Sequence, residues 1–235
     1  MAKYFSKSVR VYFEAYDPGT ALTRSGMTLA APALDVTSIT DAAERQIPDI
    51  RKDAVELVGW FDDGSDALDK ALGTLLGNAT ARPLSYLISS TVGGVGYAGT
   101  AYFLGEQAPS ELAGAVRLEG NFRPDQAWQR GAHFGERQLI ASGATGSGTV
   151  DNSAATTNGG TAFYHVFSVT GIGTGTGRLQ VEHSTDGTSW TGILELNGFT
   201  AGTAGVVAMA GTLNRYTRLT SQNGSLNCAA VLIRS

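Results

Sequence analysis

The sequence is poor in cysteine, histidine, proline and charge. Its 235 residues include one cysteine, three histidines and six prolines, and 16% of them are charged. The single cysteine, Cys228, excludes an intramolecular disulfide, and no Cys/His cluster has the spacing of a zinc site. Because 17 Lys and Arg stand against 21 Asp and Glu, a basic protein that binds nucleic acid through phosphate charge is also excluded.

Long apolar runs are missing as well. The first ten residues lack the apolar stretch of a signal peptide, and no uninterrupted run approaches the length of a transmembrane helix. We therefore expect no membrane partner and assembly in a reducing cytoplasm.

Glycine, by contrast, is frequent, and the charges are unevenly spread. The 31 glycines are about twice the usual share. Residues 1–137 carry 13 bases and 17 acids, whereas residues 138–235 carry four of each. The change begins in a stretch of small residues that is typical of a flexible connection. We therefore predict a first domain over 1–138, a linker over 139–160 and a second domain over 161–235.

The first half predicts several strands and one helix. Residues 9–15 alternate apolar and polar side chains, as a half-buried strand does. Ser65 can cap a helix over 65–76, because acids follow it and leucines form one apolar stripe. The other strands are expected at 27–31, 33–39, 54–61, 84–90, 100–106 and 112–123.

The second half predicts only strands. Glycine-rich turns separate short apolar segments at a spacing that is typical of an antiparallel sandwich or jelly roll. Asp186-Gly187 is a strong hairpin signal. The strands are expected at 161–170, 176–184, 190–197, 204–210, 215–221 and 226–234.

The candidate catalytic and ligand motifs favour a protein that is not an enzyme. Gly94–Gly99 has the form G-x-G-x-x-G, but a strand follows it where a dinucleotide site needs a helix, so we interpret it as a hairpin turn. Asp62, Asp63, Asp66 and Asp69 fit an acid-rich helix start better than a cation site. His133 and His165 have no nucleophile nearby in sequence, and Cys228 lies in an apolar strand. We expect no catalytic residue, metal or cofactor.

Trp190 is the one candidate ligand contact in the second half. It follows the tight turn Ser184–Ser189, as in hairpins of sandwich domains that stack an exposed tryptophan on a sugar. The alternative is that Trp190 covers the core beside the turn. Both interpretations stay open from the sequence.

The order of elements in residues 1–137 resembles the major tail tube proteins of long-tailed, non-contractile phages. The most specific part is the series Leu-Asp-Val-Thr, Pro and Val-Gly-Trp-Phe-Asp-Asp. Residues 145–235 resemble, by composition, the β-sandwich domains that many such proteins append. The residues that carry the first resemblance are Ala2–Phe5, Val9–Phe13, Ala33–Ser38, Ile47-Pro48 and Ala54–Asp63.

The resemblance implies a mainly β fold. A tail-tube β-sandwich or barrel-type domain with one amphipathic helix would be followed by an all-β Ig-like or jelly-roll sandwich. It also implies hexameric rings that stack into a hollow tube, through which DNA passes without sequence-specific binding. The implied partners are other copies of the chain and the tape-measure, tail-terminator and tail-tip proteins. An acidic inner wall would let DNA slide, because it repels phosphate.

The charged loop of residues 41–52 is the expected ring-to-ring contact. It mixes both signs of charge with isoleucines, which suits an interface that forms in one register. The second domain is expected to project outward and to be dispensable for assembly. A sugar-binding surface protein, a capsid decoration and a baseplate protein remain alternatives. The contact candidates are Asp41, Glu44, Arg45, Ile47, Asp49, Ile50, Arg51 and Lys52.

Overall fold

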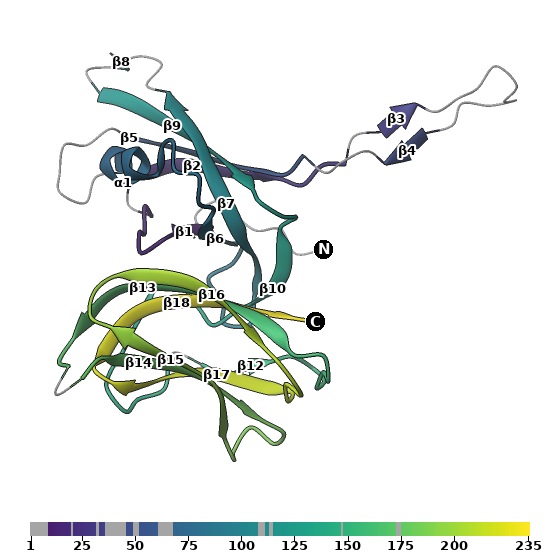
Figure 1. Cartoon of the computed structure of the whole chain (residues 1–235), viewed down its shortest axis with the longest axis vertical. Coiled ribbons are helices and arrows are strands. Elements are labelled where there is room, and N and C mark those ends of the chain that lie inside the picture. Colours follow the sequence, from purple (N-terminus) through teal and green to yellow (C-terminus); the bar gives the residue numbers. More distant parts are fainter. Residues whose placement is uncertain are drawn as a thin grey trace, which may run out of the picture.

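The described part of the chain is almost entirely antiparallel β-structure with one short helix, as the sequence predicts (Figure 1). It is seen in a computed structural model. The residues that the structure describes are 9–19, 21–31, 33–35, 46–48, 52–60, 68–107, 111–112, 115–146, 148–172 and 175–235.

The first half contains ten strands and the helix within its described residues. They are β1 (Arg10–Phe13), β2 (Leu22–Thr28), β3 (Ala33–Asp35), β4 (Gln46–Pro48), β5 (Ala54–Trp60), α1 (Leu68–Leu75), β6 (Arg82–Leu87), β7 (Val95–Gln107), β8 (Glu111–Leu112), β9 (Ala115–Pro124) and β10 (Gln129–His133).

The second half contains eight further strands in the described part of the chain. They are β11 (Gln138–Ile140), β12 (Val150–Asp151), β13 (Gly160–Thr170), β14 (Gly177–Ser184), β15 (Thr191–Phe199), β16 (Thr203–Met209), β17 (Tyr216–Asn223) and β18 (Ser225–Arg234).

One large sheet runs through both halves of the chain. Its strand order is β16-β13-β18-β10-β7-β9-β5-β2, with β6 joined to β7, β1 joined to β6, β11 joined to β18 and β8 joined to β9. The crossing point is β10, which pairs with β7 on one side and β18 on the other. A separate four-stranded sheet, β12-β17-β14-β15, packs against the β16-β13-β18 part to form the second-half sandwich (Figure 1).

β7 is long enough to change partners along its length. Val95–Ala98 pair with β10 and Ala101–Gln107 pair with β9, while Gly96–Ala101 pair with β6 on the opposite edge. Beyond Ala101, therefore, β7 has β9 as its only ladder partner among the described strands. This leaves a four-stranded sheet, β7-β9-β5-β2, at the far end of the first half.

Each half has its own hydrophobic core. In the first, Phe122 packs between Phe13 and Phe103, with ring centroids 5.3 and 5.1 Å apart, and Leu72 of α1 is buried against them. In the second, Leu179 and Leu219 of the smaller sheet belong to the same buried cluster as Leu226 and Leu232 of β18.

A third buried cluster joins the two halves. Its members come from both sides of the crossing point, and all are at most 7% exposed. The Tyr12 hydroxyl also accepts a hydrogen bond from the Arg137 backbone N–H at 2.8 Å. The two halves therefore share apolar side chains as well as a sheet. The cluster consists of Tyr12, Leu87, Ala98, Phe163, Ala229, Val231 and Ile233.

The segment predicted as a linker is packed against the second core. β11 pairs with β18 and β12 pairs with β17, and Ile140 and Val150 are buried in the second-half cluster. The strands β11 and β12 of this segment are therefore built into the second-half sandwich. The domain boundaries at 138 and 160 remain an interpretation.

The Gly94–Gly99 motif is a turn only at its start. β7 begins at Val95, so Gly96 and Gly99 lie inside a strand that the sequence placed from residue 100. A Cβ on Gly99 would lie 2.9 Å from the Trp128 ring, and one on Gly96 would lie 3.1 Å from Leu87. These two glycines make room for neighbouring side chains.

Candidate assembly site

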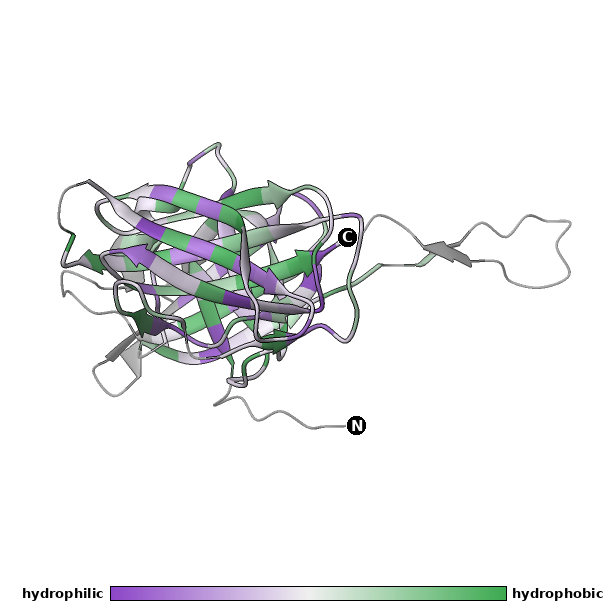
Figure 2. Ribbon diagram, turned by 90° about the horizontal axis from the view of Figure 1, so that it is seen from below, coloured by the Kyte–Doolittle hydropathy of each residue, from purple (hydrophilic) through white to green (hydrophobic). Residues whose placement is uncertain are grey.

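A two-stranded hairpin projects from the end of the β2-β5 pair. We call it the arm: β3 and β4, paired from Ala33↔Pro48 to Asp35↔Gln46, with no ladder to any other described strand. Figure 1 shows β3 and β4 standing away from the body, whose strands carry alternating hydrophobic and hydrophilic residues in Figure 2. Because β3 and β4 pair only with each other among the described strands, their outer edges are open to a strand of another subunit.

Only two of the eight residues predicted for the ring-to-ring contact lie in the part of the chain that the structure describes. Ile47 lies in β4, and Lys52 lies exposed at the root of the arm, just before β5. The other six candidates fall outside the described residues: Asp41, Glu44, Arg45, Asp49, Ile50 and Arg51.

A buried carboxylate holds the root of the arm. Asp53 is 3% exposed, and its two oxygens accept hydrogen bonds from the N–H groups of Ala30 and Trp128, at 3.3 and 3.4 Å. The Lys52 N–H also donates to the Ala30 carbonyl at 2.7 Å. The two segments that connect the arm to the body, one at Ala30 and one at Lys52, are thus hydrogen-bonded to the body at the base of the arm.

The four-stranded sheet β7-β9-β5-β2 presents two strand edges without a ladder partner in the described structure. β2 pairs with β5 alone, and the Tyr102–Gln107 part of β7 pairs with β9 alone. Unpaired edges leave backbone N–H and C=O groups available to another strand. This sheet has one such edge on each side.

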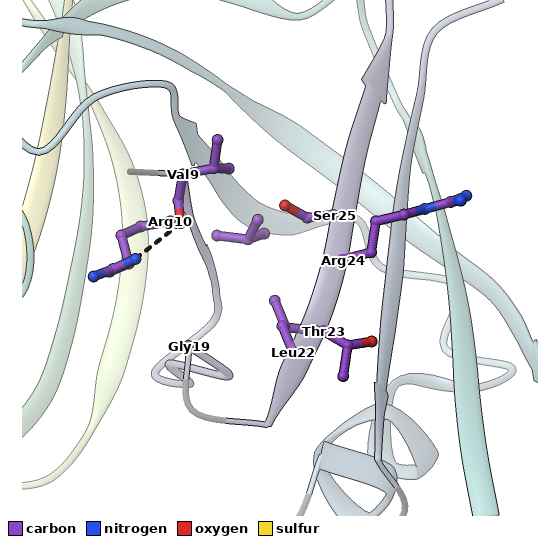
Figure 3. A pocket seen from close by; sticks show the side chains of 8 residues that line it. Val9, Arg10, Gly19, Leu22, Thr23, Arg24 and Ser25 are labelled. Atoms are coloured by element: carbon purple, nitrogen blue, oxygen red, sulfur yellow. Dashed lines mark hydrogen bonds between the residues drawn. The ribbon is translucent and has the colours of Figure 1, made fainter. Parts of the chain in front are cut away.

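The edge of β2 borders a groove. The groove lies between β1 and β2, has a volume of about 270 Å³, and is shown in Figure 3. Figure 3 also shows Arg24 extending across β5, where its guanidinium lies 3.9 Å from the Glu56 carboxylate. The residues that line the groove are Val9, Arg10, Val11, Gly19, Leu22, Thr23, Arg24 and Ser25.

Two serine–histidine contacts are present that the sequence did not suggest, and neither forms an active site. The Gly135 N–H donates to Nδ1 of His133 at 3.1 Å, so the neutral ring carries its proton on Nε2, which faces Ser89 Oγ at 3.4 Å. That tautomer cannot accept the serine proton. The histidine is fully buried and Ser89 is 5% exposed, so the pair supports the turn before β7.

His165 makes the second contact, at the junction of the two halves. Its Nδ1 donates to the Glu14 carbonyl at 2.7 Å, and its Nε2 accepts from Ser85 Oγ at 2.8 Å. This tautomer would suit a general base, but both side chains are fully buried, so no substrate can reach them. Burial lowers the pKa of His165 to about 4. The histidine therefore acts as a neutral cross-link between β13, β6 and the end of β1.

This cross-link predicts a loss of stability in mild acid. An unfolded histidine titrates near 6.5, so the unfolded chain binds this proton more tightly than the folded protein. The free energy of unfolding should be highest above pH 6.5 and fall by about 3 kcal/mol as the pH drops to about 4. Burial also lowers the pKa of His133, which adds to the effect. Urea unfolding at pH 7.5 and 4.5 measures the difference.

The matched control is His165→Gln, which cannot titrate at this position. Its stability should change less between the two pH values than that of the wild type. Equal changes in both proteins would contradict the role of His165.

Trp190 contacts an arginine on the outer sheet of the second half. The Arg218 guanidinium lies 4.1 Å above its ring, and Arg218 Nε donates to Glu182 at 2.7 Å. One face of the ring is thus covered by a held side chain. The predicted glycan contact at Trp190 stays a prediction.

The remaining candidates offer no chemistry in the described residues. Cys228 is fully buried in β18, and burial raises the pKa of its thiol to about 12. In the described part of the chain, no group of three or more His, Cys, Asp or Glu residues is placed to hold a metal ion. No helix among these residues is long and apolar enough to span a membrane.

No family model and no curated protein matches the sequence. Three solved structures show what the chain is similar to. A chain from the virion of a native gene transfer agent particle is 13% identical over 55% of this chain and 98% of that one, with a TM-score of 0.45. The SPP1 tail tube is 17% identical over 57% and 80%, with a TM-score of 0.44.

The third similar structure spans nearly the whole chain. The SPP1 Dit protein, described as a hub of the adsorption apparatus, is 11% identical over 96% of this chain and 98% of that one, with a TM-score of 0.37. A phage tail tube protein is thus among the similar structures, as the sequence resemblance predicts.

Proposed function

We propose that the chain is the structural protein of a phage-type tail tube, in which six copies form a ring and rings stack into a hollow tube. The observation that carries the proposal is the four-stranded sheet β7-β9-β5-β2 with an unpaired edge on each side. The number six comes from the sequence resemblance.

The two edges have matching strand directions. The four strands are antiparallel to one another in turn, so β2 runs opposite to β7. In a ring all copies point the same way, and β2 of one copy would therefore lie antiparallel to Tyr102–Gln107 of the next. This heterologous contact repeats around the ring and closes it, so that no edge remains open.

The exposure of apolar side chains supports this contact between β2 of one copy and β7 of the next, which we call the seam. Leu104, on the free part of β7, is 61% exposed, and a strand paired at this edge would cover part of its side chain. The opposite edge offers the groove with Val9, Val11 and Leu22. A neighbouring strand laid along β2 would cover the groove and bury apolar surface on both copies.

The direction of the core side chains distinguishes the two faces of this four-stranded sheet. Phe103 and Phe122 point into the first-half core, so Leu104, Asn121 and Glu56 lie on the opposite face. The second half packs on the core side, below β1 and β6 (Figure 1). We propose that the Glu56 face lines the lumen, that DNA passes along it without sequence-specific contacts, and that the second half faces outward.

The arm is the proposed contact between rings. It continues the strands of the sheet beyond the end of the subunit, along the direction in which rings would stack. The eight candidates from Asp41 to Lys52 belong to this contact in the proposal. The tape-measure, tail-terminator and tail-tip proteins are the proposed partners at the tube ends and interior.

Electron microscopy of the purified full chain tests the proposal. Six-fold rings or hollow tubes are expected. A monodisperse monomer at high concentration would contradict it.

A further inference from the structure

The two strands of the seam can pair in only a few registers. In an antiparallel pair, residues directly opposite each other have side chains on the same face of the sheet. Leu104 lies on the face away from the core, because Phe103 beside it packs in the core. On β2, Gly26 pairs with the exposed Glu56, whereas Met27 packs against the core. Leu104 of one copy must therefore lie opposite one of three residues of the next copy: Arg24, Gly26 or Thr28.

The end of β6 excludes one of these three registers. Ala101 of β7 pairs with Pro124 on one edge and with Arg82, the first residue of β6, on the other. The neighbouring β2 would continue along the β6 edge. If Leu104 lay opposite Arg24, Met27 of the neighbour would fall opposite Ala101, in the place that β6 already occupies. This register is therefore blocked by the subunit's own strand.

The space beside Gly26 distinguishes the two registers that remain. A Cβ atom added to Gly26 would lie within 4 Å of no other described residue, so this part of the sheet face is open. The exposed side chain of Leu104 would fill that space if it lay opposite Gly26. In the same register Thr28, the last residue of β2, faces Tyr102, the first residue of β7 beyond the β6 pairing. The paired length then ends where β2 ends.

We propose that Leu104 of one subunit packs over Gly26 of the next, with Tyr102 opposite Thr28, and that this register positions neighbouring subunits in the ring. The inference rests on the proposed function, and the partner is a second copy of this chain. A slip by one residue turns Leu104 to the wrong face of the sheet. A slip by two residues leaves the space beside Gly26 unfilled and buries less apolar surface.

Disulfide trapping in the full chain tests the register. Directly opposite residues have Cβ atoms about 4.5–5.5 Å apart, near the separation that a disulfide spans, whereas diagonal neighbours are about 7–8 Å apart. The variant Leu104→Cys/Gly26→Cys is assembled under reducing conditions, imaged and then oxidised. Denaturing gels should show a ladder of linked subunits. Both positions accept a cysteine, because Leu104 is exposed and Gly26 has free space, and the native Cys228 is fully buried.

Three matched pairs control for contacts that are not specific. Leu104→Cys/Thr28→Cys and Leu104→Cys/Arg24→Cys move the second cysteine to a diagonal position and should link far less. Leu139→Cys/Gly26→Cys uses another exposed leucine, in β11 of the second half, and should not link. Linking through Thr28 or Arg24 in preference to Gly26, or rings of the Leu104→Cys/Gly26→Cys variant that stay unlinked, would overturn the inference. Wild-type protein that forms no rings would overturn the proposed function itself.

Discussion

Deleting residues 43–50 should abolish tube formation and leave a folded subunit that still forms rings. The deletion removes β4 and with it the arm, which forms no ladder with the main sheet among the described strands. The free energy of unfolding should change by less than about 1 kcal/mol, as expected for surface changes. Negative-stain images report tubes, and urea unfolding reports stability.

The control for this deletion is the removal of residues 201 and 202, at the turn between β15 and β16. This turn is also at the surface, but it belongs to the second half, so tubes should persist. Normal tubes from the protein without residues 43–50 would remove the arm from the ring-to-ring contact.

A fragment that ends at residue 140 should fail to fold. It lacks β18, which pairs with β10 and contributes Ala229, Val231 and Ile233 to the cluster that joins the halves. Tyr12 and Leu87 would then lose their apolar cover, and Ser85 would lose His165. Each large buried side chain left facing a cavity costs about 2–5 kcal/mol, which approaches the stability of a whole domain.

Circular dichroism and gel filtration of the fragment measure this outcome. An aggregated product, or one without a cooperative thermal transition, is expected, while the full chain unfolds cooperatively. A monodisperse, folded fragment that assembles would contradict the shared core and would support the sequence-based expectation that the second half is dispensable.

Local patterns predicted the second half well. Strands such as β13, β14 and β18 lie within one or two residues of their predicted ranges, because alternation and glycine turns specify each strand on its own. The same reasoning located α1, whose Leu72 and Leu75 are buried as the leucine stripe predicts.

Long-range pairing could not be predicted in the same way. β7 begins as early as Val95 because β6 and β10 pair with it there, whereas the local sequence of Gly94–Gly99 predicts a glycine turn. The two halves are joined because β10 pairs with β18, which lies about 100 residues later in the chain. The roles of His165 and Asp53 depend on those contacts, so no local signal marked them.

The candidate site was predicted only in outline. The mixture of charges around Ile47 and Lys52 predicts a contact surface in the segment that bears the arm. The open edges of β2 and β7, however, are defined by which strands are missing beside them, and that follows from the whole sheet order. Leu104 shows the difficulty, because its exposure is visible only after folding.

Electron microscopy of the full chain, with end-on views classified without imposed symmetry, tests the central claim most directly. The account predicts closed rings of six subunits that stack into hollow tubes. Closed rings that never stack would contradict the tube and fit a hub or baseplate protein, whereas single subunits at every concentration would contradict the sealing of β2 against β7.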